Sequence, residues 1–228
     1  MTTLSIGGDS LMQNDLFQKV DGGANPTSPL QLVFRKIRPT NANNIFVKNH
    51  YARRAVPISI SFGAFLGVGF QNIVGAMSFG KPASPSLCSG ACGKENAHRI
   101  YELNRLWMSD IAPRNSESRF IGWALRILKE IYPEWIIVSY ADTAQGHTGS
   151  IYRATGWIYT GLSDARECGD YATNDNKHSR HGIKSEIPNV PRSRKNRYFY
   201  FLKKEDQKLL KYPAMKYKAL EAGDNLGG

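Results

Sequence analysis

A carboxylate and a phenol flank a short glycine-containing turn in the second half of the chain, and together they could transfer protons. Asp142 follows the nearly all-apolar run 135–138, which is typical of a buried strand. Tyr152 lies in a short segment that is expected to form a helix, which Gly156 should end. An α/β fold places chemistry at the carboxyl end of such a strand, although Asp142 could instead cap the following helix.

The elements around this carboxylate alternate between strand and helix patterns. Strands are predicted at 105–108, 135–142 and 157–159. Between the first two, apolar side chains from Phe120 to Ile131 recur at three- and four-residue spacings, as one face of an amphipathic helix requires. This βαβαβ order implies parallel pairing with right-handed crossovers, so the carboxyl ends of the strands should meet at one site.

The remaining elements are expected before and after this core. They are, in chain order, a strand at 31–38, a helix at 41–54 that carries His50 and Tyr51, an antiparallel hairpin at 58–66 and 68–79, a loop at 82–93 and a strand at 197–202. The stretch 162–195 shows almost no apolar periodicity and is expected to be a functional or disordered loop. The fold class is therefore α/β with a mixed sheet.

Length and composition favour one domain with extensions. A chain of 228 residues with 41% hydrophobic content can bury a full core. We expect a loosely ordered arm at 1–30, a catalytic domain at 31–202 and a basic tail at 203–228. No apolar run approaches the roughly 20 residues that cross a bilayer, and no signal peptide is evident, so a cytoplasmic protein without membrane contact is expected.

The three cysteines, Cys88, Cys92 and Cys168, offer no disulfide framework, which fits a reducing compartment. Cys88 and Cys92 are followed by His98 and could suggest zinc. Such a site would need a fourth ligand and tighter spacing, so free thiols are the favoured interpretation.

The positive charge is concentrated near the C-terminus. The chain carries a net charge of +11, and residues 177–218 contain thirteen Lys or Arg against three acidic residues, which is +10 of that total. Such a field usually attracts polyanions, whose binding releases counterions. A solubilising surface is the alternative interpretation. We favour a polyanionic partner.

The order of elements resembles the GNAT acyltransferase fold, in which a mixed sheet splays between two parallel strands and an acyl thioester lies in the opening. The run 151–157, with Tyr152 four residues before Gly156 and an aromatic at Trp157, resembles that family's final helix. The resemblance implies that Tyr152 donates a proton to the leaving thiolate and that acetyl-CoA is a candidate donor.

One segment departs from the GNAT pattern. GNAT enzymes usually hold the pyrophosphate on a glycine-rich turn that opens the long helix, whereas the corresponding turn 114–119 contains no glycine. Phosphate could still be held by hydroxyl and guanidinium groups, namely those of Arg105, Arg114, Ser116 and Ser118. Glu117 would repel it, so this turn argues against ordinary coenzyme A binding.

Several separated segments together resemble the phage Mom family. They are 49–52, 103–107, 140–147 and 151–157, and the resemblance extends over roughly 31–202. Mom proteins are GNAT-like enzymes that convert adenine in DNA to its carbamoylmethyl derivative and so protect phage DNA from restriction. The resemblance therefore implies double-stranded DNA as the substrate.

Carried over by position, the resemblance implies a reactive centre of His50, Tyr51, Asp142 and Tyr152. Such a set could bind iron, because imidazole, carboxylate and phenolate suit a hard transition metal. It could equally work without metal: Asp142 would accept a proton from the adenine amine, His50 would relay it and a tyrosine would protonate the leaving group. Without the resemblance, a His–Tyr pair on a helix is more often a packing pair.

The product constrains the donor. Plain acyl transfer attaches the carbonyl carbon to the adenine nitrogen, whereas a carbamoylmethyl group is attached through its methylene. Glycyl-adenine and carbamoylmethyladenine are isomers, so an activated glycine such as glycyl-tRNA, followed by a rearrangement, balances every atom. An acetyl-CoA donor would need a separate nitrogen source and an oxidation, for which iron would be useful.

Adenine inside a duplex must be flipped out before its amine can react, at a cost on the order of a few kcal/mol that phosphate contacts must offset. We expect a DNA-contacting insertion at about 163–195, with Arg192, Arg194, Lys195 and Arg197 on the backbone. Two alternatives remain open. One is a generic GNAT N-acyltransferase acting on a small amine or protein with acetyl-CoA, and the other is a non-catalytic nucleic-acid-binding protein.

Overall fold

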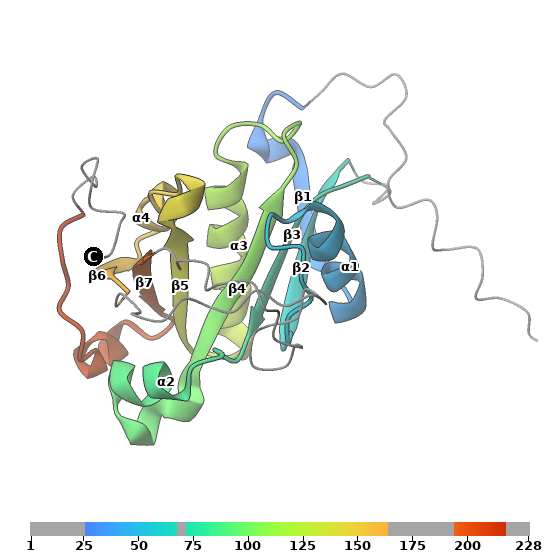
Figure 1. Cartoon of the computed structure of the whole chain (residues 1–228). Helices are drawn as coiled ribbons and strands as arrows, with labels where there is room; N and C mark the ends of the chain where they lie inside the picture. The colour runs from blue at the N-terminus through green and yellow to red at the C-terminus, as the bar shows by residue number, and fades with distance from the viewer. Residues whose placement is uncertain (1–25, 68–71, 164–193, 218–228) are drawn as a thin grey trace, which may run out of the picture.

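A seven-stranded mixed sheet forms the centre of the molecule (Figure 1), a computed structural model that describes residues 26–67, 72–163 and 194–217. The strand order is β1-β2-β3-β4-β5-β7-β6. The strands are β1 (Leu32–Lys36), β2 (Ile60–Leu66), β3 (Asn72–Gly80), β4 (Ile100–Met108), β5 (Ile136–Asp142), β6 (Ile158–Leu162) and β7 (Lys195–Phe201). The α-helices are α1 (Pro39–Asn49), α2 (Pro85–Cys92), α3 (Ser116–Ile131) and α4 (Ser150–Ala154).

The sheet opens between its two parallel strands. β4 and β5 pair only from Ile100↔Ile136 to Glu102↔Val138, although β4 continues to Met108. Beyond these pairs the strands separate towards their carboxyl ends. The expected α/β fold with a splayed central sheet is confirmed.

The predicted pairing of the third strand is wrong. β6 does not pair with β5, because β7 lies between them and runs antiparallel to both. β7 faces β5 along its whole length, from Ile136↔Phe201 to Asp142↔Lys195. Local periodicity detects a strand but not its partner, so a strand from much later in the chain could not be placed by the βαβαβ pattern.

α3 covers one face of the sheet. Its buried apolar side chains are Phe120, Ile121, Ala124, Leu125 and Leu128, as the apolar spacing predicts. Phe120 stacks on Phe34 of β1, with ring centroids 4.8 Å apart. Truncation of this buried phenylalanine to alanine would cost about 3–5 kcal/mol.

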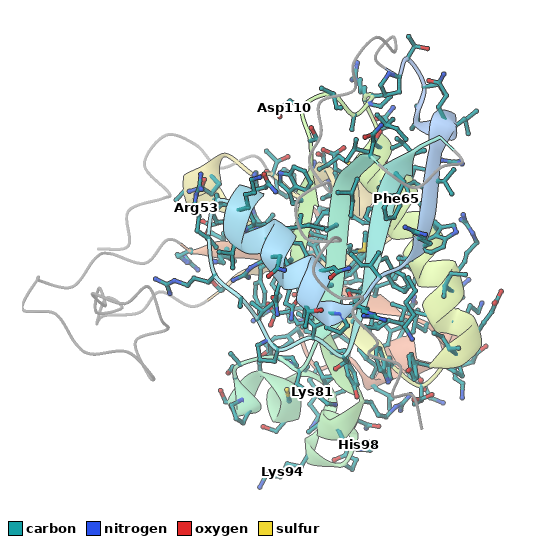
Figure 2. All side chains as sticks on the ribbon, turned by 90° about the vertical axis from the view of Figure 1, so that its right-hand side faces the viewer. Arg53, Phe65, Lys81, Lys94, His98 and Asp110 are labelled. Carbon is teal, nitrogen blue, oxygen red and sulfur yellow. The ribbon has the colours of Figure 1, made fainter. Side chains whose placement is uncertain are left out.

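α1 covers the opposite face, where its side chains Ala42, Ile45 and Phe46 pack on Ala76 of β3. The helix ends at Asn49, so the prediction of a helix to residue 54 is wrong. The backbone N–H of His50 still bonds to the Phe46 carbonyl, but His50 itself is extended. His50 and Tyr51 therefore lie in the turn that follows the helix, with Arg53 at the same end of α1 in Figure 2.

The expected loop at 82–93 contains a helix. α2 begins at Pro85, and the hydroxyl of Ser84 accepts the N–H of Leu87 at 3.3 Å as its cap. The helix consists mostly of small residues with little apolar periodicity, so the sequence pattern does not predict it. Cys88 and Cys92 are both unpaired thiols on it, and burial raises the pKa of Cys92 to about 11. Cys168 lies outside the described residues.

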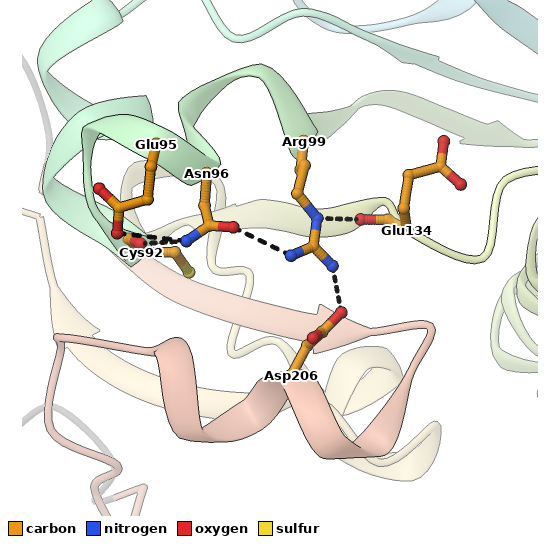
Figure 3. A network of polar contacts seen from close by, with 6 residues as sticks. All are labelled: Cys92, Glu95, Asn96, Arg99, Glu134 and Asp206. Carbon is orange, nitrogen blue, oxygen red and sulfur yellow. Dashed lines mark hydrogen bonds and ion pairs between the residues drawn. The ribbon is translucent and has the colours of Figure 1, made fainter.

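The described part of the predicted tail returns along the sheet and packs on it (Figure 3). Arg99 forms an ion pair with Asp206, while its Nε donates to the Glu134 carbonyl at 2.9 Å. Further along, the N–H of Met215 donates to the Tyr159 carbonyl at 2.8 Å. Within the described ranges, no helix has the length and apolar character needed to span a bilayer.

Candidate active site

A pocket of about 390 Å³ lies where the carboxyl halves of β4 and β5 separate. Its walls come from six segments: the turn after α1, the end of β4, the end of β5, the first turn of α3, the loop before α4 and α4 itself. Three of the four predicted catalytic residues line it. The lining side chains include His50, Tyr51, Leu106, Trp107, Met108, Glu117, Tyr140, His147, Ile151 and Tyr152.

Asp142 stands at the border of this pocket. Oδ2 lies 3.1 Å from Nζ of Lys195, and Oδ1 accepts the N–H of Ala144 at 3.1 Å. The capping role that the sequence left open is therefore real. Burial is the largest cause of the raised pKa of Tyr51, and the negative charge of Asp142 is the second. The Asp142 carboxylate therefore acts electrostatically on a residue that lines the pocket.

Tyr152 places its hydroxyl at the point where the two parallel strands part. Ser139 Oγ lies 2.8 Å from the Tyr152 hydroxyl and 3.0 Å from the Leu103 carbonyl of β4. A serine has one proton and can donate to only one of these oxygens at a time. When it bonds to Leu103, Tyr152 must donate to Ser139; when it bonds to Tyr152, the phenol proton is free to point elsewhere. Burial raises the pKa of Tyr152 to about 12, so the phenol keeps its proton near neutral pH.

His50 is buried and neutral. Burial, with smaller contributions from the nearby Arg105, His147 and Lys195, lowers its pKa to about 4. Nδ1 accepts the N–H of Ala52 at 3.1 Å. The proton of the neutral ring therefore sits on Nε2, so His50 acts as a hydrogen-bond donor there.

Tyr51 is half exposed at the pocket, with its ring 4.2 Å from that of His50 and 5.9 Å from that of His147. His147, which the sequence reading left outside the catalytic set, thus lines the pocket as well. Its place in the glycine-containing turn after β5 was the signal available for it. The result is a small aromatic wall with one face open to solvent.

The loop 146–149 is stabilised by hydrogen bonds from Arg153 and Tyr198, two residues that the sequence did not indicate. The Thr148 carbonyl accepts hydrogen bonds from Arg153 Nη1 at 2.6 Å and from the Tyr198 hydroxyl at 2.9 Å. Gly149 has a φ of +71°, and a Cβ there would lie 2.4 Å from the Tyr198 ring. Only glycine fits this close approach.

The first turn of α3 is not a phosphate cradle of the usual kind. Ser116 is fully buried and its hydroxyl donates to the Pro113 carbonyl at 2.6 Å, while Ser118 donates to Asn115 at 3.1 Å. Arg114 is exposed outside the pocket lining. Glu117 lines the pocket instead. The hydroxyl of Ser116 is thus engaged inside the turn, which argues against the phosphate contact expected of it.

Arg105, also predicted to bind the donor, lies beside the turn after α1. Its Nη1 donates to the Asn104 carbonyl at 2.7 Å, and Nε is buried without a hydrogen-bond partner in the described part of the chain. Its charge acts on both His50 and Tyr51. Arg105 thus contributes positive potential to the pocket from one side.

The predicted DNA contacts divide into different environments. Lys195 pairs with Asp142, and Arg194 Nε donates to the Ser163 carbonyl at 2.9 Å; both are partly exposed. Arg197 is buried, with Nε bonded to Thr160 Oγ1 at 3.0 Å and its guanidinium 3.6 Å from the Tyr212 ring centroid. This burial and the contact with β6 argue against the DNA contact expected of Arg197. Arg192 lies outside the described residues.

The four predicted ligands do not fit an iron site. His50 Nδ1 and Asp142 Oδ1 accept backbone N–H groups, and Asp142 Oδ2 pairs with Lys195. Burial raises the pKa of both Tyr51 and Tyr152, which disfavours phenolate ligands. Among the residues that the structure describes, no group of three or more His, Cys, Asp or Glu side chains could hold a metal ion.

The comparisons with known proteins agree on a family. The model of the Mom protein family matches residues 31–219. The methylcarbamoylase Mom of Escherichia phage Mu is 35% identical over 127 residues, which are 54% of this chain and 51% of that protein. The match thus spans about half the length of this curated relative.

Solved acetyltransferases are more distant. Spermidine/spermine N-acetyltransferase SpeG from Vibrio cholerae has a TM-score of 0.48 and 12% identity, over 79% of this chain and 98% of that one. Ribosomal-protein-S5-alanine acetyltransferase from Vibrio fischeri has a TM-score of 0.47 and 9% identity, over 76% of this chain and 94% of that one.

Proposed function

Because the chain belongs to the Mom protein family, we propose that it is a DNA modification enzyme that converts adenine in duplex DNA to carbamoylmethyladenine. In a phage, this product would protect the DNA from host restriction. The observation that carries the proposal is the convergence of His50, Tyr51 and Tyr152 on one pocket, with Asp142 at its border. These side chains come from three separate segments of the chain.

Each group has a task that its surroundings support. Asp142 accepts a proton from the exocyclic amine of adenine. Tyr152 keeps its proton near neutral pH and can donate it to a leaving group beside the strand opening. His50 differs from the relay expected from the sequence: as a neutral Nε2–H donor, it is suited to hold an oxygen or ring nitrogen of the bound groups.

The donor proposed is an activated glycine, such as glycyl-tRNA, rather than acetyl-CoA. Glycine transfer followed by rearrangement to the isomeric carbamoylmethyl group needs neither an added nitrogen source nor an oxidant. Glu117 supports this choice, since its carboxylate lines the pocket at the end of α3 where a coenzyme A pyrophosphate would otherwise bind. The engaged hydroxyl of Ser116 removes a further phosphate contact.

Access to duplex adenine requires base flipping. Tyr51 supports this step, because its half-exposed ring stands at the pocket and offers an aromatic face for a stacked purine. Arg194 and Lys195 are positioned at the start of β7, close to Asp142, where they can meet phosphates. The greater part of the expected insertion 163–195 lies outside the described residues.

The test is mass spectrometry of nucleosides from cells that express the wild type, Asp142→Ala or Lys94→Ala. Lys94 is exposed in the 3-10 helix Lys94–Arg99 beyond α2, so its variant is a control for expression and charge. The proposal expects a new adenine adduct with the wild type and the control and none with Asp142→Ala. Absence of an adduct from every sample would overturn it. Isotopic glycine supplied to the same cells should label the adduct, and an unlabelled adduct would exclude glycine as the donor.

A further inference from the structure

A second basic region lies in the N-terminal part of the chain, although the net charge of the whole chain does not indicate it. Residues 22–94 contain eight Lys or Arg and no Asp or Glu. The net charge of the whole chain does not reveal this segment, because acidic residues in other segments offset its positive charges and leave the sum close to that of 177–218 alone. Two of its arginines, Arg53 and Arg54, follow the pocket residues His50 and Tyr51 after a single intervening residue, Ala52.

The turn at 50–54, which we call the α1 turn, presents these arginines beside the pocket. Arg53 and Arg54 are exposed, and neither forms an ion pair with an acidic group of the described chain. The charge of Arg54 acts on Arg105, which in turn acts on His50. Figure 2 shows Arg53 at the end of α1 and Lys94 at the opposite end of the molecule. Arg53 and Arg54 therefore place two positive charges at the pocket end of α1.

The α1 turn and the start of β7 lie on different sides of the pocket. α1 packs on β2 and β3, whereas Lys195 opens β7 on the far side of β5. The pocket forms between β4 and β5, so cations stand on both sides of it. A nucleotide rotated out of a duplex remains joined to phosphates on both its 5′ and 3′ sides, and a pocket that receives it benefits from cations on both flanks.

We propose that the α1 turn, through Arg53 and Arg54, binds the sugar–phosphate backbone of duplex DNA on the side of the pocket opposite Lys195. The inference rests on the proposed function, since it takes the flipped nucleotide as the occupant of the pocket. It adds a contact surface that lies outside the insertion 163–195. Tyr51, between His50 and these arginines, connects the phosphate contacts with the pocket.

The charge of Arg53 can be removed by a substitution to glycine that should not strain the backbone. Its φ of +44° lies in the left-handed region, where glycine is favoured. The side chain makes one hydrogen bond, from Nη1 to the Lys48 carbonyl at 3.1 Å. Arg53→Gly thus relieves the backbone while deleting the guanidinium. Arg54→Gln deletes a charge that makes no hydrogen bond in the described part of the chain, and it decides the result if Arg53→Gly fails to fold.

The experiment measures binding of the full chain to a fluorescent adenine-containing DNA duplex over a series of salt concentrations. Lys94→Ala is the matched control, since it removes the same charge far from the pocket. We expect Arg53→Gly and Arg54→Gln each to raise Kd several-fold and to reduce the slope of log Kd against log salt by about 1. Lys94→Ala should leave the slope at the wild-type value.

Two results would separate the failure of this surface from the failure of the proposed function. If the arginine variants match Lys94→Ala while the wild type binds DNA and forms the adduct, the α1 turn is not a DNA contact and the proposed function stands. If the arginine variants lose affinity but the wild type forms no adduct, the contact stands and the proposed function fails.

Discussion

Asp142 Oδ2 lies 3.1 Å from Nζ of Lys195, and these two residues are also register partners at the end of β5 and the start of β7. The pair joins the expected proton acceptor to an expected DNA contact. A phosphate that attracted Lys195 would leave the carboxylate with less positive charge beside it. A DNA contact by Lys195, as proposed, would therefore change the electrostatic surroundings of Asp142 through this one ammonium group.

Substitution Lys195→Gln should therefore have two effects. The partly buried carboxylate would lose its ion pair with the Lys195 ammonium, which should lower the free energy of unfolding by about 1 kcal/mol. DNA affinity should fall and its salt dependence should weaken by about one unit of slope. Lys195→Arg is the control that keeps the charge. Thermal melting and salt-dependent binding measure the two effects, and equal behaviour of both variants would contradict the role of the charge.

Tyr152→Phe should separate the hydroxyl from the ring. The ring packs near Trp157 and Tyr198, with centroids 5.1 Å from each, so stability should change by no more than about 1 kcal/mol. Adduct formation should fall by about 100-fold if the phenol donates a proton in the reaction. Mass spectrometry of nucleosides measures the adduct. Normal adduct levels in a folded Tyr152→Phe variant would remove the proposed role.

Ser139→Ala tests the hydrogen bond that tunes this phenol. Burial raises the Tyr152 pKa and the bond to Ser139 lowers it, so removal of the hydroxyl should move the pKa further upward. The Leu103 carbonyl would also lose its partner. A carbon-13 titration of the labelled tyrosine ring measures the shift. A downward shift would show that Ser139 does not stabilise the phenolate.

The stability of the protein should depend on pH through His50. Its folded pKa of about 4 lies below the ordinary value of 6.5, mainly because of burial. The unfolded chain gains a proton on this ring as pH falls through 6.5, whereas the folded protein does not until about pH 4. Stability that is present above pH 6.5 is therefore lost as pH falls towards 4, by ~3 kcal/mol from this group.

His50→Gln provides the comparison, because glutamine does not titrate. The variant should lose less stability than the wild type between pH 7 and pH 4, as measured by denaturant unfolding at each pH. All other groups contribute nearly equally to both proteins. Parallel curves for the two would show that His50 titrates normally in the folded state.

The loop 146–149 offers a pair of matched substitutions. Gly146 and Gly149 have φ values of +67° and +71°, but a Cβ at Gly146 meets nothing within 4 Å, whereas one at Gly149 meets the Tyr198 ring at 2.4 Å. Gly146→Ala should cost about 1 kcal/mol from the backbone alone. Gly149→Ala should cost about 1–3 kcal/mol more, because the ring must move. Melting temperatures of the two variants test the difference, and equal values would contradict it.

The sequence predicted the parts of the site whose signals are local. The apolar spacing of α3 and the run before Asp142 identified one helix and the central strand, since burial imposes a period on side chains. The pairing of β7 with β5 and the hydrogen bond from Ser139 to Tyr152 depend on residues distant in the chain. No local pattern reports such contacts.

Arg197 and the α1 turn show the limits of counting charge. Arg197 was counted as a surface cation, yet its guanidinium is buried beside Tyr212. Arg53 and Arg54 were overlooked because acidic residues in other segments offset their contribution to the total. Composition records how many charges a chain has, but the fold decides which of them reach solvent.

The insertion of β7 between β5 and β6 also determines when the pocket can form during synthesis of the chain. Lys195 follows Asp142 by 53 positions, so a nascent chain presents β5 with one edge unpaired until the ribosome has made most of the protein. The ion pair of Asp142 and the buried contacts of Arg197 also cannot form before β7 has been synthesised, because Lys195 and Arg197 both belong to it. A chain released before residue 195 would carry the helix of Tyr152 but not β7, whose Tyr198 packs against that helix, and with β5 unpaired at one edge it should be inactive and prone to aggregate.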